Sequence, residues 1–354
     1  MALPATTYDT ATLVNPDSNL TDFTLIVDLS RMSAAWWSAV DTSDGTKGRA
    51  AKDSGPTELA CDWIDFDDSA ETGLLRVKWS GTLSDTGTQT LRIYPPQSGN
   101  ASVAASDTYG SDNAYDSDWA AYWPLHDAND RTANGYDLTA GGGVTAGGVA
   151  GKLGAATDFD GTDDWFERTA SSPNIGPGKT LFAWVNYDAT NYVSRVIEIQ
   201  DTSTLSYQQI LPVFGLFRAN EYNGTTQASA SSSSTIVTGT WYFHAAKFVS
   251  ATERYAFLDS TRFGPGTTNV DSTGDGTADR LGIGAASDGS GTHMNAKIQH
   301  VQAHSTARAD DWIEYEYDQI NDQATFWGTW TNVPVAGGIS IPVVMHHRRM
   351  MGVS

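Results

Sequence analysis

Short apolar runs separated by turn residues constrain the fold of this chain more than any other feature. Runs such as 24–28 and 181–187 alternate or are rich in β-branched and aromatic side chains, and Gly, Asn, Asp and Ser bound them. The chain has 34 Gly among its 354 residues, which suits a protein with many tight turns. No apolar run approaches the ~20 residues that a membrane-spanning helix needs. The pattern predicts an all-β protein without membrane insertion.

The strand pattern divides the chain into two units. Residues 1–96 predict a small β-sandwich that the pair Pro95-Pro96 ends, because proline cannot donate to a strand ladder. Residues 97–118 are small and polar and predict a linker. A second set of strands fills residues 119–332, and residues 333–354 form an acid-free, apolar and basic tail.

Three local patterns make sharper predictions. Residues 309–321 place apolar side chains at helical spacing, with Asp310 or Asp311 as the cap, so we expect one short C-terminal helix. Ser33 predicts the N-cap of a shorter helix. Pro212 predicts that its strand is broken or lies at a sheet edge.

The charge balance argues against nucleic acid as a partner. The chain carries 42 acidic and 21 basic residues, a net charge of -21, and a phosphate backbone requires Lys and Arg to displace its counterions. The single cysteine, Cys61, allows no intramolecular disulfide, and we expect it to be a small half-buried side chain. The first residues resemble no signal peptide, so we expect a product made in a cytoplasm.

Several motifs of the second unit resemble the concanavalin A-like and laminin-G-like jelly-roll superfamily. Residues 151–165 resemble the Gly-Lys-x-Gly-x-Ala-x-x-Phe-Asp-Gly strand and turn of that family. Residues 123–138, 180–185, 240–248 and 281–284 resemble further strands and follow in the expected order. The resemblance implies a concanavalin-like jelly-roll sandwich.

The first unit resembles, more faintly, a small domain of unknown function. That domain precedes concanavalin-like domains in phage-borne and bacterial surface proteins. The likeness rests on Thr57–Leu59, Trp63 and Val77–Trp79, although Pro95-Pro96 replaces the usual Gly-Asn after the last strand.

The sequence argues against catalysis. Glucanases among the jelly-roll relatives use an acid pair about 5–5.5 Å apart on one strand face. Here Gln200 stands where the central Asp belongs and Thr202 where the second Glu belongs, next to Glu198 and Asp201. We read Glu198 and Asp201 as a solvated strand end and predict no enzyme. A hydrolase stays open only with an acid pair assembled from separate strands.

Calcium is the one cofactor that the sequence leaves open. Asp271 and Asp275 partly fit a calcium loop, although Gly282 stands where an EF-hand needs a bidentate Glu. The resemblance implies a rim-loop alternative at Asp127 and Asp130, or at residues 158–164. The competing interpretation is a set of plain turns. For zinc, His300 and His304 share a strand face, but we expect them to be surface or rim residues.

Two functional hypotheses follow. The first is a non-enzymatic virion structural protein of a tailed phage (capsid decoration, head fibre or tail-associated), made in the host cytoplasm, displaying a lectin-like domain and forming a homo-oligomer. Its basic tail would dock onto other virion proteins. The alternative is a carbohydrate-binding adhesin that recognises surface glycans, with Tyr222 and Asn223 as the first exposed candidates in the loop after Phe217. The predicted tail contacts are Pro342, Met345, Arg348 and Arg349.

Overall fold

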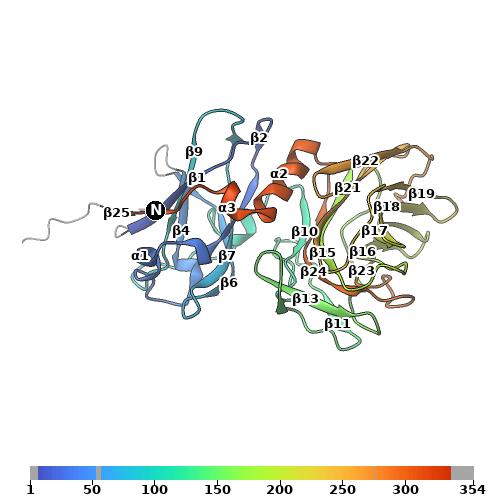
Figure 1. Cartoon of the computed structure of the whole chain (residues 1–354), viewed down its shortest axis with the longest axis horizontal. Coiled ribbons are helices and arrows are strands. Elements are labelled where there is room, and N and C mark those ends of the chain that lie inside the picture. Colours follow the sequence, from blue (N-terminus) through green and yellow to red (C-terminus); the bar gives the residue numbers. More distant parts are fainter. Residues whose placement is uncertain (1–6, 53–56, 275, 336–354) are drawn as a thin grey trace, which may run out of the picture.

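Two β-rich units lie side by side in the computed structural model (Figure 1), which describes residues 7–52, 57–274 and 276–335. Every paired strand is antiparallel to its neighbours. The α-helices of the described residues are short: α1 (Ala34–Trp37), α2 (Asp310–Asn321) and α3 (Gln323–Phe326). The prediction of an all-β protein is confirmed.

The first unit is a small sandwich of two main sheets. Its five-stranded sheet has the order β25-β1-β9-β4-β5, its three-stranded sheet the order β3-β7-β6, and β2 and β8 form a separate pair. The strands are β1 (Thr7–Leu13), β2 (Leu20–Thr21), β3 (Thr24–Asp28), β4 (Arg49–Lys52), β5 (Thr57–Leu59), β6 (Cys61–Asp67), β7 (Thr72–Lys78), β8 (Thr82–Leu83), β9 (Gln89–Tyr94) and β25 (Thr331–Pro334).

The second unit is a jelly roll of two larger sheets. An eight-stranded sheet has the order β12-β13-β24-β15-β20-β21-β22, with β10 also paired to β24, and a seven-stranded sheet has the order β11-β14-β23-β16-β17-β18-β19. Its first strands are β10 (Trp119–Trp123), β11 (Thr139–Gly141), β12 (Gly148–Ala150), β13 (Ala155–Asp160), β14 (Trp165–Arg168), β15 (Lys179–Tyr187) and β16 (Ile197–Asp201). The others are β17 (Ser206–Val213), β18 (Leu216–Asn223), β19 (Gln227–Ser231), β20 (Trp241–Ser250), β21 (Glu253–Leu258), β22 (Thr261–Gly266), β23 (Arg280–Ile283) and β24 (Asn295–His304).

The helix predictions hold in position and fail in one detail. Helix α2 occupies the predicted segment, and Ser33 caps α1 by accepting a hydrogen bond from the Trp36 amide at 3.1 Å. The predicted cap of α2 is wrong, because Ala309 occupies that position and makes no side-chain bond. Asp310 lies in the first turn and instead forms ion pairs with Lys247 and Arg262.

The prediction for Pro212 is also wrong. Strand β17 lies between β16 and β18 and is continuous through Pro212. The ladder with β16 covers only residues 206–210 of β17, so Pro212 lies beyond it and the missing N–H breaks no bond there.

Three side chains are more buried than expected: His300 and His304 were predicted at the surface or rim, and Cys61 was predicted to be half-buried. His300 and His304 are 1% and 2% exposed, and burial lowers the pKa of His300 to about 3, which keeps the ring neutral. The His300 ring contacts the Tyr122 hydroxyl at 2.7 Å. Cys61 is 7% exposed, and burial raises the pKa of its thiol to about 12, so it is not a reactive thiolate.

The two units are joined by more than the connecting segment. After the jelly roll, the chain returns to the first unit, where β25 pairs with β1 in the register Thr7↔Pro334. The predicted boundary after residue 332 therefore falls inside β25. Residues 97–118 lie against the first unit, for example through a hydrogen bond from Thr24 Oγ1 to the Ala114 carbonyl at 2.9 Å. They do not form a free tether.

A buried ion pair stabilises the position of the two units relative to each other. Arg76 of β7 donates from Nη2 to Glu316 Oε1 of α2 at 3.0 Å, and both side chains are 0% exposed. Gln302 of β24 donates to the same carboxylate at 2.7 Å, and Gln319 donates to its other oxygen. The Arg76 guanidinium also lies 4.8 Å from the centre of the Tyr122 ring in the jelly roll. Although burial alone disfavours its charge, Glu316 raises the pKa of Arg76 above its ordinary value.

We expect Arg76→Met to cost about 3–5 kcal/mol of unfolding free energy, because it leaves the Glu316 charge buried without its partner. Urea denaturation measures the loss. The matched control is Arg262→Met, which breaks an exposed ion pair with Asp310 and should cost less than about 1 kcal/mol. Equal effects of the two substitutions would show that the buried pair does not hold the units together.

Candidate functional site

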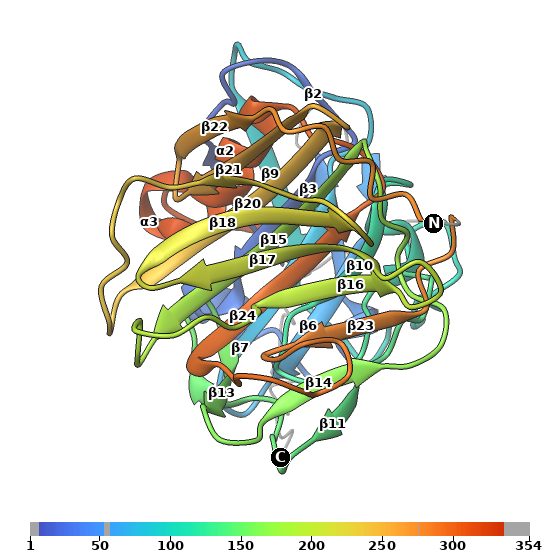
Figure 2. The same ribbon diagram turned by 90° about the vertical axis from the view of Figure 1, so that its right-hand side faces the viewer.

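The outward face of the seven-stranded sheet carries polar and aromatic side chains on four adjacent strands. Figure 2 shows β18, β17, β16 and β23 side by side on the side of the jelly roll away from the first unit. Alternation sends Ile197, Ile199, Ile210, Phe217, Ala219, Leu281 and Ile283 into the core. The residues between them point outward, and we call the outward residues of these four strands the polar face.

The strand register arranges the polar face in rows that run across the sheet. One row contains Gly282, Glu198, Gln209 and Asn220, on β23, β16, β17 and β18. The next row contains Arg280, Gln200, Tyr207 and Tyr222 on the same strands. A third row pairs Leu211 with Arg218. Hydrogen-bonding side chains and two aromatic rings therefore share one continuous surface.

Tyr207 and Tyr222 form an aromatic pair on this face. Their ring centres lie 5.1 Å apart with an interplanar angle of 31°, and both side chains are half-buried. Burial is the main cause that raises the pKa of Tyr207, so its hydroxyl stays protonated and can donate. Partly accessible rings of this kind offer apolar area and a polar tip together.

Beside the tyrosines lie two buried carboxamides with unpartnered atoms. Gln209 and Asn220 are each 1% exposed. Asn220 Oδ1 accepts from Gln227 at 2.8 Å, but Asn220 Nδ2 and Gln209 Oε1 have no hydrogen-bond partner. Burying such a group without a partner costs about 1–3 kcal/mol. The row thus holds a free donor and a free acceptor on directly opposed residues.

The loop after β23 forms a wall on one side of the polar face. A side chain at Gly282 would place its Cβ 2.7 Å from the Ser287 Cα, so glycine permits the loop to cross the sheet there. Ser287 holds the loop in place, because its amide donates to Glu198 Oε1 at 2.9 Å and its hydroxyl to Gln200 Oε1 at 2.7 Å. Glu198 is therefore engaged in holding this wall.

The acids considered for hydrolysis are buried on opposite faces of β16. Glu198 points outward and is 4% exposed, whereas Asp201 is 1% exposed and accepts from Ser203 and Thr204 in the following turn. The expectation of a solvated strand end is wrong for both. Their separation by the sheet removes them as a pair acting on one glycosidic bond.

The predicted glycan contacts have different positions in the structure. Both belong to β18, not to a loop after Phe217. Tyr222 lies on the polar face, whereas Asn223 Oδ1 accepts from the Thr225 and Thr226 amides and shapes the turn to β19. The sequence analysis missed Tyr207, Gln209 and Asn220, although the alternation of 206–213 and 216–223 about their core residues was a signal that could have found them.

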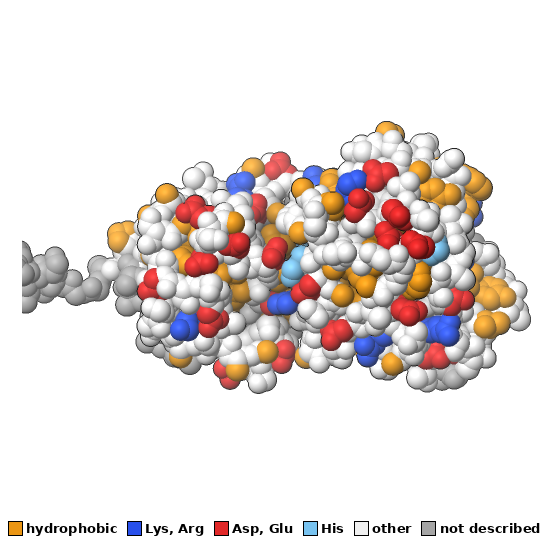
Figure 3. Space-filling model, turned by 90° about the horizontal axis from the view of Figure 1, so that it is seen from below, with side chains coloured by type: hydrophobic (Ala, Val, Ile, Leu, Met, Phe, Trp, Pro, Cys, Tyr) orange, Lys and Arg blue, Asp and Glu red, His pale blue; other side chains and the backbone are white. Residues whose placement is uncertain are grey.

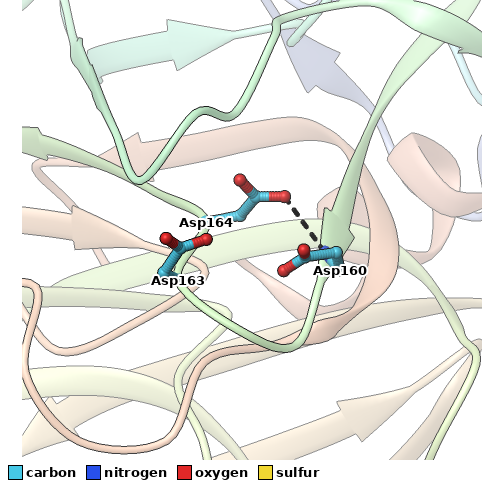
Figure 4. Close-up of side chains that lie close together, drawn as sticks. All are labelled: Asp160, Asp163 and Asp164. Carbon is cyan, nitrogen blue, oxygen red and sulfur yellow. Dashed lines mark hydrogen bonds between the residues drawn. The ribbon is translucent and has the colours of Figure 1, made fainter.

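A group of carboxylates marks a candidate cation site at the rim of the jelly roll. Asp160, Asp163 and Asp164, in the loop from β13 to β14, are the one such group of three or more His, Cys, Asp or Glu found in the described ranges (Figure 4). One ligand oxygen from each lies within 4.8 Å of the others. Burial is the main cause that raises the pKa of Asp164, and its acidic neighbours add to the effect. A set of oxygen-only donors suits calcium.

The other predicted cation ligands have structural partners instead. Asp130 accepts hydrogen bonds from the Tyr122, Thr132 and Tyr136 amides and supports a buried turn. Asp127 pairs with His126 at 3.2 Å. Asp271 accepts from the amide of Thr273 at 3.0 Å. Asp275 and the predicted tail contacts Pro342, Met345, Arg348 and Arg349 lie outside the described residues.

The surface as a whole agrees with the acidic composition. Acidic side chains are spread over the face shown in Figure 3, with fewer basic side chains among them. None of the described helices is long and apolar enough to cross a membrane.

Comparison with known proteins identifies the second unit. The model of the family described as the concanavalin A-like lectin/glucanases superfamily matches residues 160–314. The jelly roll is therefore a concanavalin A-like domain, as its motifs predicted. A search of curated protein sequences found no match.

Two solved structures each match 57% of this chain. Domain 4 of an extracellular GH43 arabinanase from Geobacillus stearothermophilus, in complex with arabinotriose, has a TM-score of 0.48 at 16% identity, covering 57% of this chain and 98% of that one. The botulinum neurotoxin serotype D binding domain has a TM-score of 0.44 at 12% identity, covering 57% and 51%. This chain therefore spans about half the length of that neurotoxin chain.

We expect 10 mM calcium to raise the melting temperature by about 2 °C, because an ion bound only to the folded state stabilises it. Differential scanning calorimetry measures the shift, and Asp163→Asn should abolish it. Asp271→Asn is the matched control, since Asp271 is exposed and outside the rim group. A shift that survives in Asp163→Asn but disappears in Asp271→Asn would move the site to the loop containing Asp271.

Proposed function

We propose that this chain is a non-enzymatic carbohydrate-binding protein whose jelly roll binds glycans on the polar face. The observation that carries the proposal is the combination of the Tyr207–Tyr222 pair with the unpartnered atoms of Gln209 and Asn220 on one outward surface.

Sugar chemistry matches these groups. A hydroxyl group both donates and accepts, so the hydroxyls of a sugar complement the acceptor Gln209 Oε1 and the donor Asn220 Nδ2. The apolar face of a sugar ring packs on a tyrosine ring, whose hydroxyl remains free for a polar contact. Few convergent polar groups beside aromatic area are typical of small-ligand sites.

The first unit has a separate role in this proposal. It fixes the orientation of the jelly roll through α2 and the Arg76–Glu316 pair, and the polar face lies on the opposite side of the jelly roll. The first unit is then a rigid support that holds the binding surface outward.

We expect binding on a glycan array, and Tyr222→Ala should weaken the strongest signal by about tenfold or more through loss of packed aromatic area. The matched control is Tyr255→Ala, which removes a tyrosine from β21 of the other sheet and should leave binding unchanged. Circular dichroism verifies that both variants fold. An array without signal, with and without calcium, would contradict the proposal.

We propose as the setting of this function the virion of a tailed phage, with the chain as a capsid decoration, head fibre or tail-associated protein. The acidic composition, the single cysteine and the likeness of the first unit to domains in phage-borne surface proteins support it. Virion proteins would be its partners and a homo-oligomer its state.

The test is incorporation into particles after deletion of residues 336–354. This deletion leaves β25 and its pairing with β1 intact, so the body should still fold and sediment as before. We expect particles that lack the truncated protein, and light scattering should show whether the deletion also dissociates an oligomer. Normal incorporation of the truncated protein would show that residues 336–354 are not the anchor.

A further inference from the structure

The arginines of the polar face differ from the other arginines of the jelly roll. Arg131, Arg195, Arg254, Arg262 and Arg308 each form an ion pair with an acidic side chain. Across the described residues, Arg218 and Arg280 form no ion pair and no side-chain hydrogen bond. Arg168 also forms no ion pair, but it donates to the Ser171 and Asp137 carbonyls, so among the described arginines of the jelly roll only Arg218 and Arg280 lack both kinds of contact.

Of the two arginines, Arg218 gives the stronger evidence for an anionic ligand. It follows Phe217 and precedes Ala219, which both point into the core, so its own side chain points outward. Its Nε is buried and has no acceptor. A charged donor without an acceptor is more costly than a neutral one, and an anionic acceptor forms the strongest bond with it. Asn220 Nδ2, two residues along the same face, is a second free donor.

Arg280 extends the positive charge to the other side of the tyrosine pair. It lies in the row of Tyr207 and Tyr222, two strands from Tyr207. An acidic side chain, Asp288, lies near it: a hydrogen bond from Ser290 is the largest cause that lowers the Asp288 pKa, and the charge of Arg280 adds a smaller contribution. With Arg195, which binds Glu198, three arginines lie on or beside the polar face, and the acids near them are Glu198, Asp288 and, on the adjacent strand β14, Glu167.

We infer that the glycan bound by the polar face is an acidic oligosaccharide whose carboxylates pair with Arg218 and Arg280. This inference rests on the carbohydrate-binding function proposed above. The Cα atoms of the two arginines are separated by three strand spacings and four residues, roughly 20 Å, so one monosaccharide does not reach both. The tyrosine pair and the two carboxamides lie on β17 and β18, on the Arg218 side of this span, and contact the neutral part of the glycan.

The experiment compares each acidic glycan with its own carboxyl-reduced form. Pairs of uronic-acid oligosaccharides and sialylated glycans, and their reduced forms, are printed on one array and probed with the full chain. Calorimetry then measures the best pair in solution. We expect the acidic form to bind about tenfold more tightly, and Arg218→Gln and Arg280→Gln each to remove most of that difference while changing affinity for the reduced form less than about twofold.

The matched control is Arg262→Gln, which removes the same charge from the other sheet and should leave the preference unchanged. Equal binding of acidic and reduced forms, both weakened by Tyr222→Ala, would overturn the acidic specificity and leave the carbohydrate function standing. A loss of preference in Arg262→Gln equal to that in Arg218→Gln would attribute it to net charge and would also overturn the inference. Absence of binding to every glycan would defeat both proposals.

Discussion

The ion pair between Arg76 and Glu316 is the interaction on which the arrangement of this molecule depends. The guanidinium comes from the three-stranded sheet of the first unit, the carboxylate from α2, and the supporting amide of Gln302 from the jelly roll. Strands β7 and β24 and helix α2 therefore share one charge cluster without access to water, and Arg76 lies 240 residues from Glu316 along the chain. Because a buried charge is tolerated only when its partner is in place, neither unit can rotate away without exposing or orphaning these groups.

A second buried pair performs the same task inside the jelly roll. Arg254 of β21 binds Glu221 of β18, and Ser272 donates to the same carboxylate at 2.9 Å. This pair connects the eight-stranded sheet to the back of the strand that carries Arg218, Asn220 and Tyr222. The polar face is thus built on a strand whose inward side is fixed by charge as well as by Phe217 and Ala219.

Sequence reasoning recovered what depends on local pattern. The alternation of apolar residues, the Ser33 cap and the helical spacing around Trp312 are read within a few residues, and the structure bears them out. It failed where contacts between residues distant in sequence determine the burial and the partners of a side chain. His300 is buried because Tyr122 and the Leu153 carbonyl satisfy its ring, and Asp310 leaves its capping role for Lys247 and Arg262. The polar face escaped prediction because its members come from four strands that only the sheet order brings together.

The pairing of β1 with β25 has a consequence for how this body can be built into larger architectures. Thr7 and Pro334 are direct partners across the ladder, so the first and last strands of the described residues begin and end side by side, with Cα atoms about 5 Å apart. A folded unit whose two ends lie side by side can be inserted into another protein as a domain. It fits between two neighbouring residues of a surface loop in another protein without stretching that loop, and joining its ends by a short bridge permits new termini to be opened elsewhere.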